Sequence, residues 1–361
     1  SANALVSTET WDWSLDDLRT HPTPDRSRVE ENEEEVEAEL GATWERPLSS
    51  GRLQVVGLQR WGDETLTSSS RDADGQERFD SEETTGESIG RISLTRILSP
   101  RLTLEGGLEG AFNWREGKAF SEEDGVEIEL PSSDVRVEER RAEAALSATW
   151  RPAARWSVEA GLRVETSELS QSGETEASRS LTYAKPRLNT VWTPDDNSEW
   201  RLRIEREVGQ LDFGDFITSA SLDTGQVSAG NADLRPAAAW VVEAVYERRF
   251  WGEGALTLTL INEAIEDAID RVPVVSPSGV FDAPGNIGDA ERRVAQVRLA
   301  LPLGRLGVEG GLLKTFVEFA HTEANDPTTG ERRRMSDYNP FESEVEFTQD
   351  LPARRIKWGV S

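Results

Sequence analysis

Apolar and polar residues alternate along much of the chain, most regularly between residues 101 and 115. Leu102, Leu104 and Leu108 lie at even positions, with Phe112 further along, whereas most odd positions hold Arg, Thr, Glu or Asn. A period of two residues is typical of a β-strand with one apolar and one polar face. The even face is free of charge over about 13 residues, longer than the roughly 9 to 11 that a tilted strand needs to cross a bilayer. This stretch therefore predicts a strand long enough to span a membrane.

The same alternation on both sides of a short turn predicts β-hairpins. Even positions are apolar from Trp240 to Tyr246, and Arg248 and Phe250 follow. A Gly-containing turn comes next at 251–254, and the pattern resumes from Leu256 to Leu260. Similar turns are centred near residues 48, 99, 153, 196, 303 and 352. For residues 36–44 a helix is also compatible, because Glu, Ala and Leu favour helices, although the turn that follows favours a hairpin.

The connections between the expected strands are unequal. Turns at one end of the hairpins are short, while connections at the other end are long and polar, as in outer-membrane barrels with short periplasmic turns and long extracellular loops. Aromatic residues next to the short turns include Trp44, Trp150, Trp156, Trp192, Trp200, Phe250, Trp251 and Trp358. A ring of such side chains suits the headgroup level of a membrane. We therefore predict an all-β fold, a transmembrane antiparallel up-and-down β-barrel with about 14 strands in this chain.

A soluble β-sandwich is the main structural alternative, since its strands alternate too. Sandwich strands average about five or six residues, whereas several strands expected here are longer. The 361 residues are 36% hydrophobic, with a mean hydropathy of -0.57. A run of about 18 apolar residues, which a membrane-spanning helix needs, is absent from the sequence. A barrel accounts for these observations, because its strands need apolar residues only at alternate positions.

Charge and composition exclude several kinds of site. The formal net charge of -28 argues against a nucleic-acid partner, which requires a basic surface. The chain contains no Cys, which excludes disulfides and thiolate metal sites. Its two histidines, His21 and His321, are interpreted as polar surface or lumen residues, because neither belongs to a recognisable catalytic pattern. We expect no catalytic site, no metal site and no cofactor.

Polar segments divide the chain between the hairpins. Residues 1–34 form a leading region whose structure the pattern does not define, and residues 35–361 form the hairpins. Long extracellular loops are expected at about 62–87, 115–140, 166–180, 209–239, 266–292 and 321–342. Loops on a rigid scaffold concentrate binding residues, so ligand recognition is expected in them. Their acidic character suits a cationic siderophore or a metal chelate, and it also suits plain solubility.

Three segments in the second half of the chain resemble the barrel of TonB-dependent outer-membrane receptors. Residues 230–236 match a Gly-Asn-x-x-Leu-x-Pro pattern that precedes a barrel strand in this family, and residues 286–290 resemble its Asn-x-Gly-x-Ala step into a strand. Residues 338–341, Tyr-Asn-Pro-Phe, lead to a Phe-Thr-Gln-Asp-Leu-Pro segment. The positions that match the first pattern are Gly230, Asn231, Leu234 and Pro236. Residues 35–229 agree with the family only in their hairpin pattern.

The resemblance implies a structural role for those four residues and an outer-membrane location. Barrels of the family have about 22 strands and an N-terminal plug that engages the inner-membrane protein TonB. The plug and the C-terminal strands are absent from this chain, and Ser1 does not begin a signal peptide. We therefore expect an internal portion of a longer receptor. Its charged lumenal residues either face the plug or form a solvated network.

We hypothesise an outer-membrane receptor that imports a scarce ligand, such as an iron chelate, a vitamin or a glycan, with energy derived from TonB. The expected partners are outer-membrane lipid, TonB acting through the plug, and a small-molecule or glycan ligand. Two other functions fit the same pattern. One is a passive outer-membrane channel or structural barrel without energy coupling, and the other is a soluble acidic β protein. An enzyme is not expected.

Overall fold

The computed structural model describes residues 1–19, 25–73, 75–174, 176–222, 226–276, 279–336 and 338–361. The long strands are β1 (Ala2–Arg19), β2 (Asp25–Leu48), β3 (Gly51–Arg71), β4 (Gln76–Ser99), β5 (Leu102–Glu123), β7 (Asp134–Ala153), β8 (Trp156–Gly173), β9 (Ala177–Asp195), β10 (Ser198–Val208), β13 (Ala238–Phe250), β14 (Gly254–Glu266), β17 (Ala290–Pro302), β18 (Gly311–Asn325), β20 (Phe341–Leu351) and β21 (Ile356–Val360). The remaining elements are β6 (Val126–Ile128), β11 (Ser219–Ser221), β12 (Gln226–Ser228), β15 (Ile269–Ser276), β16 (Gly279–Asn286), β19 (Arg332–Arg333) and the 3-10 helices η1 (Phe213–Phe216), η2 (Leu303–Leu306) and η3 (Pro352–Arg354). Within these ranges, no helix has the length and apolar character needed to cross a membrane.

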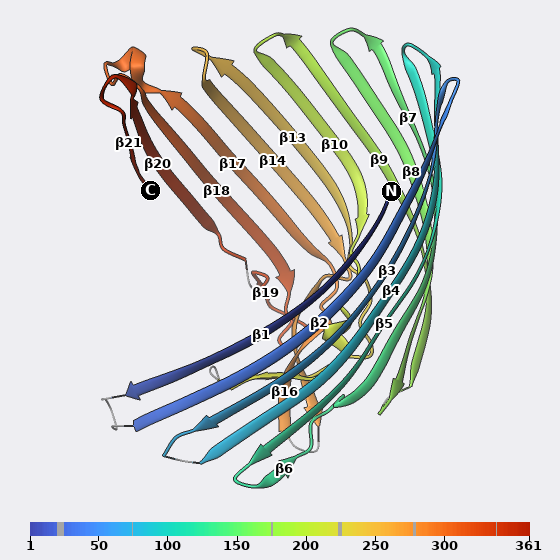
Figure 1. Ribbon diagram of the computed structural model, residues 1–361, viewed down its shortest axis with the longest axis vertical. Helices are drawn as coiled ribbons and strands as arrows, with labels where there is room; N and C mark the ends of the chain where they lie inside the picture. The colour runs from blue at the N-terminus through green and yellow to red at the C-terminus, as the bar shows by residue number, and fades with distance from the viewer. Residues whose placement is uncertain (20–24, 74, 175, 223–225, 277–278, 337) are drawn as a thin grey trace.

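The long strands form one strongly curved wall (Figure 1). Each long strand pairs antiparallel with the next one along the chain, from β1 and β2 to β20 and β21. The sheet has 17 strands, and without the short β6 and β19 the wall itself has fifteen. This up-and-down order confirms the predicted fold class. The strand beyond the predicted 14 is β1, in the region that the sequence pattern left undefined.

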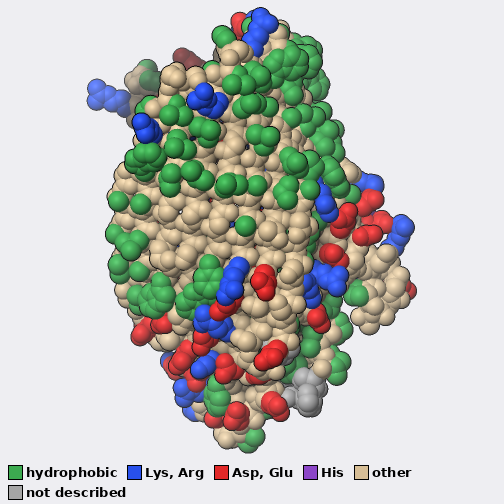
Figure 2. Space-filling model, turned by 90° about the vertical axis from the view of Figure 1, so that its right-hand side faces the viewer, with side chains coloured by type: hydrophobic (Ala, Val, Ile, Leu, Met, Phe, Trp, Pro, Cys, Tyr) green, Lys and Arg blue, Asp and Glu red, His purple; other side chains and the backbone are tan. Residues whose placement is uncertain are grey.

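The two faces of the wall differ in composition. Leu146 of β7 lies opposite Leu162 of β8, and these side chains are 63% and 46% exposed on the convex face. Glu143 and Glu165 are another opposite pair on the same two strands, and they lie on the concave face. Figure 2 views the wall from its convex side, where hydrophobic side chains gather toward the short turns and charged ones toward the loop end. The wall therefore presents an apolar surface outward and a polar surface inward, as a membrane barrel requires.

Three of the segments expected as loops, 62–87, 115–140 and 166–180, are largely β-strand. The clearest case is the pair of β3 and β4, which stay in register along the whole of β3 from Gly51 to Arg71. The prediction of loops was wrong because a loss of apolar residues was read as the end of a strand. Beyond the bilayer both faces of a strand meet water, so a polar sequence can keep the backbone ladder. The wall therefore extends well past its apolar belt.

The remaining expected loops, 209–239, 266–292 and 321–342, hold the irregular part of the molecule. A second sheet, in the order β11, β12, β16, β15, lies within the first two of these segments. Its strands β12 and β16 pair parallel, whereas the other pairs are antiparallel. This sheet lies at the loop end of the wall (Figure 1).

The short turn near residue 303 is longer than predicted. The 3-10 helix η2 ends at Leu306, and β18 begins only at Gly311. Gly307 and Gly310 have φ angles of 93° and 64°, which glycine adopts without steric cost. The chain therefore continues as a turn between η2 and β18, and Glu309 lies within this turn.

Candidate functional site

The concave face of β7 to β10 holds a network of paired charges. Lys185 of β9 donates a hydrogen bond of 2.7 Å to Glu165 of β8 and lies 3.5 Å from Glu143 of β7. Arg163 of β8 lies 3.5 Å from Glu205 of β10. The side chains of Lys185, Glu165 and Glu205 are only 9%, 12% and 8% exposed. The network borders a cavity of about 410 Å³.

The strand register explains why this network needs cations from several strands. Glu143 lies directly opposite Glu109 of β5 and Glu165 of β8. Like charges at opposite positions repel each other, so cations must lie between them. Arg141 lies 3.4 Å from Glu109, and Arg91 of β4 binds the same carboxylate. On this part of the wall, each cluster of carboxylates is balanced by cations of neighbouring strands.

The concave face of β1 to β4 has a different charge balance. Glu9, Glu35, Glu64 and Glu83 lie directly opposite one another on these four consecutive strands and form an acidic row. Arg115 of β5 pairs with Glu83. The described cations form no ion pair with the other three members of the row. The acidic row therefore carries negative charge that this part of the chain does not neutralise.

A folded segment between β10 and β13 packs against the concave face near the loop end. Phe216 of η1, Ile217 and Leu234 are almost fully buried and belong to one cluster with Val137 of β7. The cluster requires a small residue on β5, since a Cβ atom on Gly117 would lie 2.7 Å from the Cδ1 atom of Ile217. The segment is thus anchored to the wall by apolar contacts.

Hydrogen bonds join this segment to the stretch before β17. The Nδ2 atom of Asn231 donates to the carbonyl oxygen of Pro284 at 2.9 Å. The backbone N–H of Arg235 donates to Oδ1 of Asn286 at 2.8 Å, and Nδ2 of Asn286 donates back to the carbonyl of Arg235 at 2.9 Å. The two sequence patterns at 230–236 and 286–290 thus meet in space.

The other pattern residues fill the space between these segments. A side chain at Gly230 would overlap the carbonyl oxygen of Phe216, so the backbone approaches closely there. Leu234 is fully buried and Pro236 is buried as well. Gly230 has no side chain, and the buried side chains of Leu234 and Pro236 offer no exposed polar group to a ligand, so all three residues contribute to packing.

A clamp of three charged residues joins two loops at the loop end. The guanidinium of Arg333 lies 2.7 Å from Asp270 and 2.8 Å from Asp326. A hydrogen bond from the backbone of Thr329, together with the contact with Arg333, lowers the pKa of Asp326 to about 2. Burial of Asp270 opposes its ionisation, but hydrogen bonds from the backbone N–H of Ser336 and from Arg333 outweigh burial and lower its pKa. Both carboxylates therefore stay ionised near neutral pH.

The sequence of this curved, charge-lined wall matches a known protein family. A family model described as "TonB dependent receptor-like, beta-barrel" matches residues 3–337. This chain belongs to the TonB-dependent receptor-like β-barrel family. Proteins of this family are outer-membrane receptors or transporters and not enzymes, so the wall lies in the outer membrane. Its short turns then face the periplasm and its loop end faces the exterior.

Solved structures of outer-membrane transporters share the TonB-dependent receptor fold. The ferric citrate transporter FecA in its unliganded form is 13% identical, with a TM-score of 0.65 over 95% of this chain and 56% of that chain. The copper transporter OprC is 10% identical, with a TM-score of 0.61 over 97% of this chain and 65% of that chain. A double mutant of the Serratia marcescens hemophore receptor HasR, in complex with its hemophore HasA and heme, is 11% identical, with a TM-score of 0.57 over 99% and 68% of the two chains. At such identities the likeness shows the fold alone.

The chain spans less than two thirds of the length of the ferric citrate and copper transporters. A search of curated proteins found no matching sequence.

His321 belongs to no cluster of catalytic or metal-binding side chains in the described part of the chain. His321 lies on β18 with its side chain 58% exposed, 3.9 Å from Glu323. His21 lies outside the described residues. In the described ranges, no group of three or more His, Asp or Glu side chains could hold a metal ion.

Sequence reasoning missed the acidic row. Residues 1–34 were assigned no defined structure, although odd positions from Glu31 to Glu39 are all Glu. That alternation was a signal for a charged strand face. The alignment of Glu35 with carboxylates on three other strands depends on the register between hairpins, which the sequence of one strand does not specify.

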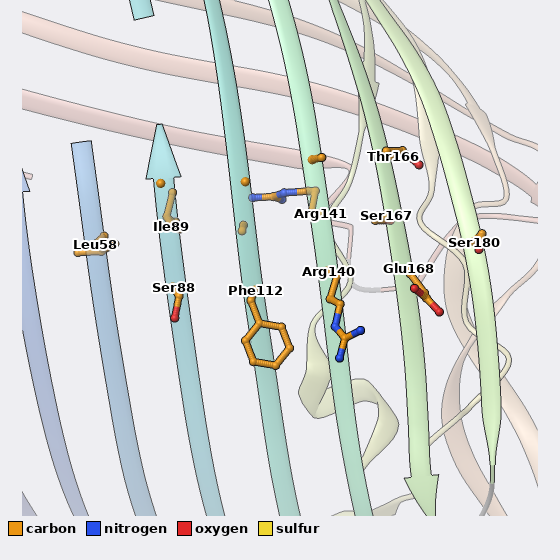
Figure 3. A pocket seen from close by; sticks show the side chains of 14 residues that line it. Leu58, Ser88, Ile89, Phe112, Arg140, Arg141, Thr166, Ser167, Glu168 and Ser180 are labelled. Atoms are coloured by element: carbon orange, nitrogen blue, oxygen red, sulfur yellow. The ribbon is translucent and has the colours of Figure 1, made fainter. Parts of the chain in front are cut away.

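A shallow pocket of about 770 Å³ lies on the other face of the wall (Figure 3). Phe112 of β5, Arg140 of β7 and Glu168 of β8 lie side by side in one register row that lines it. The guanidinium of Arg140 lies 5.9 Å from the centroid of the Phe112 ring. These side chains share the convex face with Leu146, opposite to the face of Glu143. This pocket therefore opens to the outside of the barrel and does not belong to a path through it.

Proposed function

We propose that this chain is the barrel wall of an outer-membrane receptor that imports a scarce ligand, such as an iron chelate, a vitamin or a glycan, with TonB-derived energy. The main support is a charged concave face with a cavity of about 410 Å³ in a member of the TonB-dependent receptor-like family. An ion-lined interior suits an occluding domain or a polar ligand. The fold neighbours named for transport of ferric citrate and copper, and for heme-hemophore binding, favour the same ligand classes.

In this proposal the ligand first binds at the loop end. The candidate binding region comprises the extended strand ends at about 62–87 and 115–140 and the loops at about 209–239, 266–292 and 321–342. The clamp of Asp270, Arg333 and Asp326 and the Asn231 and Asn286 hydrogen bonds hold part of this region in a fixed arrangement. A fixed arrangement lowers the entropic cost of binding. A plug domain paired with the charged wall would then connect the bound ligand to TonB.

Ligand uptake by intact cells tests this proposal. Cells that express the full-length receptor are given labelled ferric citrate, copper, heme and a vitamin or glycan panel, with and without functional TonB. We expect concentrative uptake of one ligand class that stops when TonB is removed or the proton-motive force is collapsed. Uptake that persists unchanged without TonB would instead identify a passive channel.

A further inference from the structure

Two tryptophans stand beside the acidic row on β1. Trp11 lies opposite Glu33 of β2, and Trp13 lies opposite Glu31. Their side chains are 59% and 39% exposed, and Nε1 of Trp13 donates a hydrogen bond of 2.7 Å to Glu31. Both residues share the concave face with Glu9, because alternate residues of a strand point to the same side. Exposed indole faces next to carboxylates form a surface that suits an organic cation.

A buried hydroxyl group without a partner lies on the same face. Ser68 of β3 is directly opposite Glu31 and is fully buried. Its Oγ atom has no hydrogen-bond partner among the residues that the structure describes. Because an unpaired buried polar atom costs free energy, this hydroxyl is a ready donor or acceptor for a group that enters beside Glu31. The face thus has an aromatic, an anionic and a neutral polar component.

The charge of this face is largely uncompensated by the wall itself. Arg60 lies 2.9 Å from Glu39, and Arg115 pairs with Glu83. Among the described residues, neither these nor other cations pair with Glu33 or with the remaining members of the acidic row. Carboxylates directly opposite one another destabilise a sheet. A bound cation would relieve this repulsion.

The geometry favours an extended organic cation over a metal ion. The described carboxylates include no group of three or more that could hold one metal ion. Neighbouring strands lie about 4.8 Å apart, so the acidic row presents carboxylates in a line at that spacing. A flexible chain with amines separated by a few methylene groups matches such a line, and its apolar links can lie against the indole rings.

We propose that the acidic row, together with Trp11, Trp13, Glu31 and Glu33, binds a small organic polycation that bears two or more ammonium or guanidinium groups. This patch lies beyond the apolar belt, since Asp12 and Asn32 hydrogen-bond to each other on the convex side of the same strands. A ligand that arrives from the exterior would therefore meet it early. The assignment rests on the proposed import function, for which it names the ligand class.

Calorimetric titration of the full-length receptor with spermine at low salt tests this proposal. We expect binding that weakens at least tenfold in Glu35→Gln/Glu64→Gln, because two carboxylates are lost. Trp11→Ala/Trp13→Ala is expected to weaken binding about threefold or more, and Trp11→Phe/Trp13→Phe to restore most of it, because a phenyl ring retains the cation–π contact. The matched control is Glu159→Gln, which removes a lumenal carboxylate paired with Arg187 on the other part of the wall. We expect it to change the affinity less than twofold.

Three results would overturn the assignment. They are no spermine binding by the folded wild type, equal losses in the Glu35→Gln/Glu64→Gln and Glu159→Gln variants, and displacement of spermine by Mg²⁺ at equal total charge. Failure of the import function has a separate signature. TonB-dependent uptake of another ligand without spermine binding would refute this inference alone, whereas spermine binding without energy-dependent uptake of any ligand would support it and refute the proposed function.

Discussion

The concave face of the wall contains two regions that use the same residue types in opposite ways. On β7 to β10, Lys185 lies within 3.5 Å of both Glu143 and Glu165, and the side chains are mostly buried. On β1 to β3, Glu9, Glu35 and Glu64 are aligned in register, and no cation of the described residues forms an ion pair with them. The first region satisfies its own charges, and the second does not.

The two regions therefore have different roles: the paired network stabilises the wall, and the acidic row can bind a ligand. A closed ion-pair network makes a wall resistant to change, because removal of one partner leaves a buried charge. An open carboxylate row destabilises the empty wall slightly and leaves interaction energy for a ligand. Removal of a lumenal charge is therefore expected to destabilise the paired region and to stabilise the region of the acidic row.

The largest effect is expected from Lys185→Met in the paired region. The substitution leaves Glu143 and Glu165 close together with 16% and 12% exposed side chains, and should cost roughly 3 to 5 kcal/mol of unfolding free energy. Urea unfolding in detergent micelles measures it. Arg60→Met removes a cation of β3, the strand that also carries Glu64 of the acidic row. The Arg60 side chain is 51% exposed, so the substitution should cost less than about 1 kcal/mol of unfolding free energy. Similar costs for the two variants would remove the distinction between the regions.

The next effect tests whether the two regions share one inward face. Leu146 lies on the convex side with its side chain 63% exposed, so Leu146→Arg should cost about 2 to 4 kcal/mol in a lipid bilayer. Ser147 points to the lumen, and Ser147→Arg should cost well under half as much. Folding equilibria in lipid vesicles measure both. Equal penalties would contradict the assignment of sides.

A gain in stability is expected when two carboxylates of the acidic row are replaced by neutral side chains. Glu35→Gln/Glu64→Gln removes repulsion between carboxylates that lie opposite each other, and should stabilise the empty receptor by about 0.5 to 1 kcal/mol. The gain should shrink in high salt, because salt screens exposed charges. Thermal unfolding at low and high ionic strength measures it. A loss of stability would show that the row is already neutralised.

The smallest effect is a pH dependence of the clamp at the loop end. The pKa of Asp326 is lowered to about 2, below the value of about 3.9 in an unfolded chain. Its ionised form therefore stabilises the clamp fully above that unfolded value, and the contribution is lost as the pH falls through about 2. We expect amide hydrogen exchange of residues 328–333, corrected for the intrinsic rate at each pH, to be faster at pH 2 than at pH 4. Asp326→Asn should show the same corrected exchange at both pH values, and the same behaviour in the wild type would refute the clamp.

The sequence predicted the elements that depend on local alternation. The strand from Leu102 and the hairpin that starts at Trp240 follow from a period of two residues, and the structure has them as β5 and as β13 with β14. The inward and outward faces followed from the same pattern. Each of these features depends on neighbours within one hairpin.

The features that the sequence did not predict depend on contacts between distant segments. The polar strand ends at 62–87 lack an apolar face, so only pairing with their neighbours identifies them as strands. The burial of Leu234 depends on Val137, almost a hundred residues earlier in the chain. The acidic row depends on the register of four strands. Alternation within one segment specifies none of these contacts.

The most direct test measures the electrostatic potential at one lumenal position in each region. The chain has no Cys, so Leu66→Cys beside Glu33 and Ser147→Cys on β7 each introduce a single thiol. Each thiol reacts with a cationic and an anionic thiosulfonate reagent at low salt. We predict a ratio of cationic to anionic rates that is more than tenfold higher at residue 66 than at residue 147, and a smaller difference in high salt. Equal ratios at the two positions would contradict the difference between the two regions.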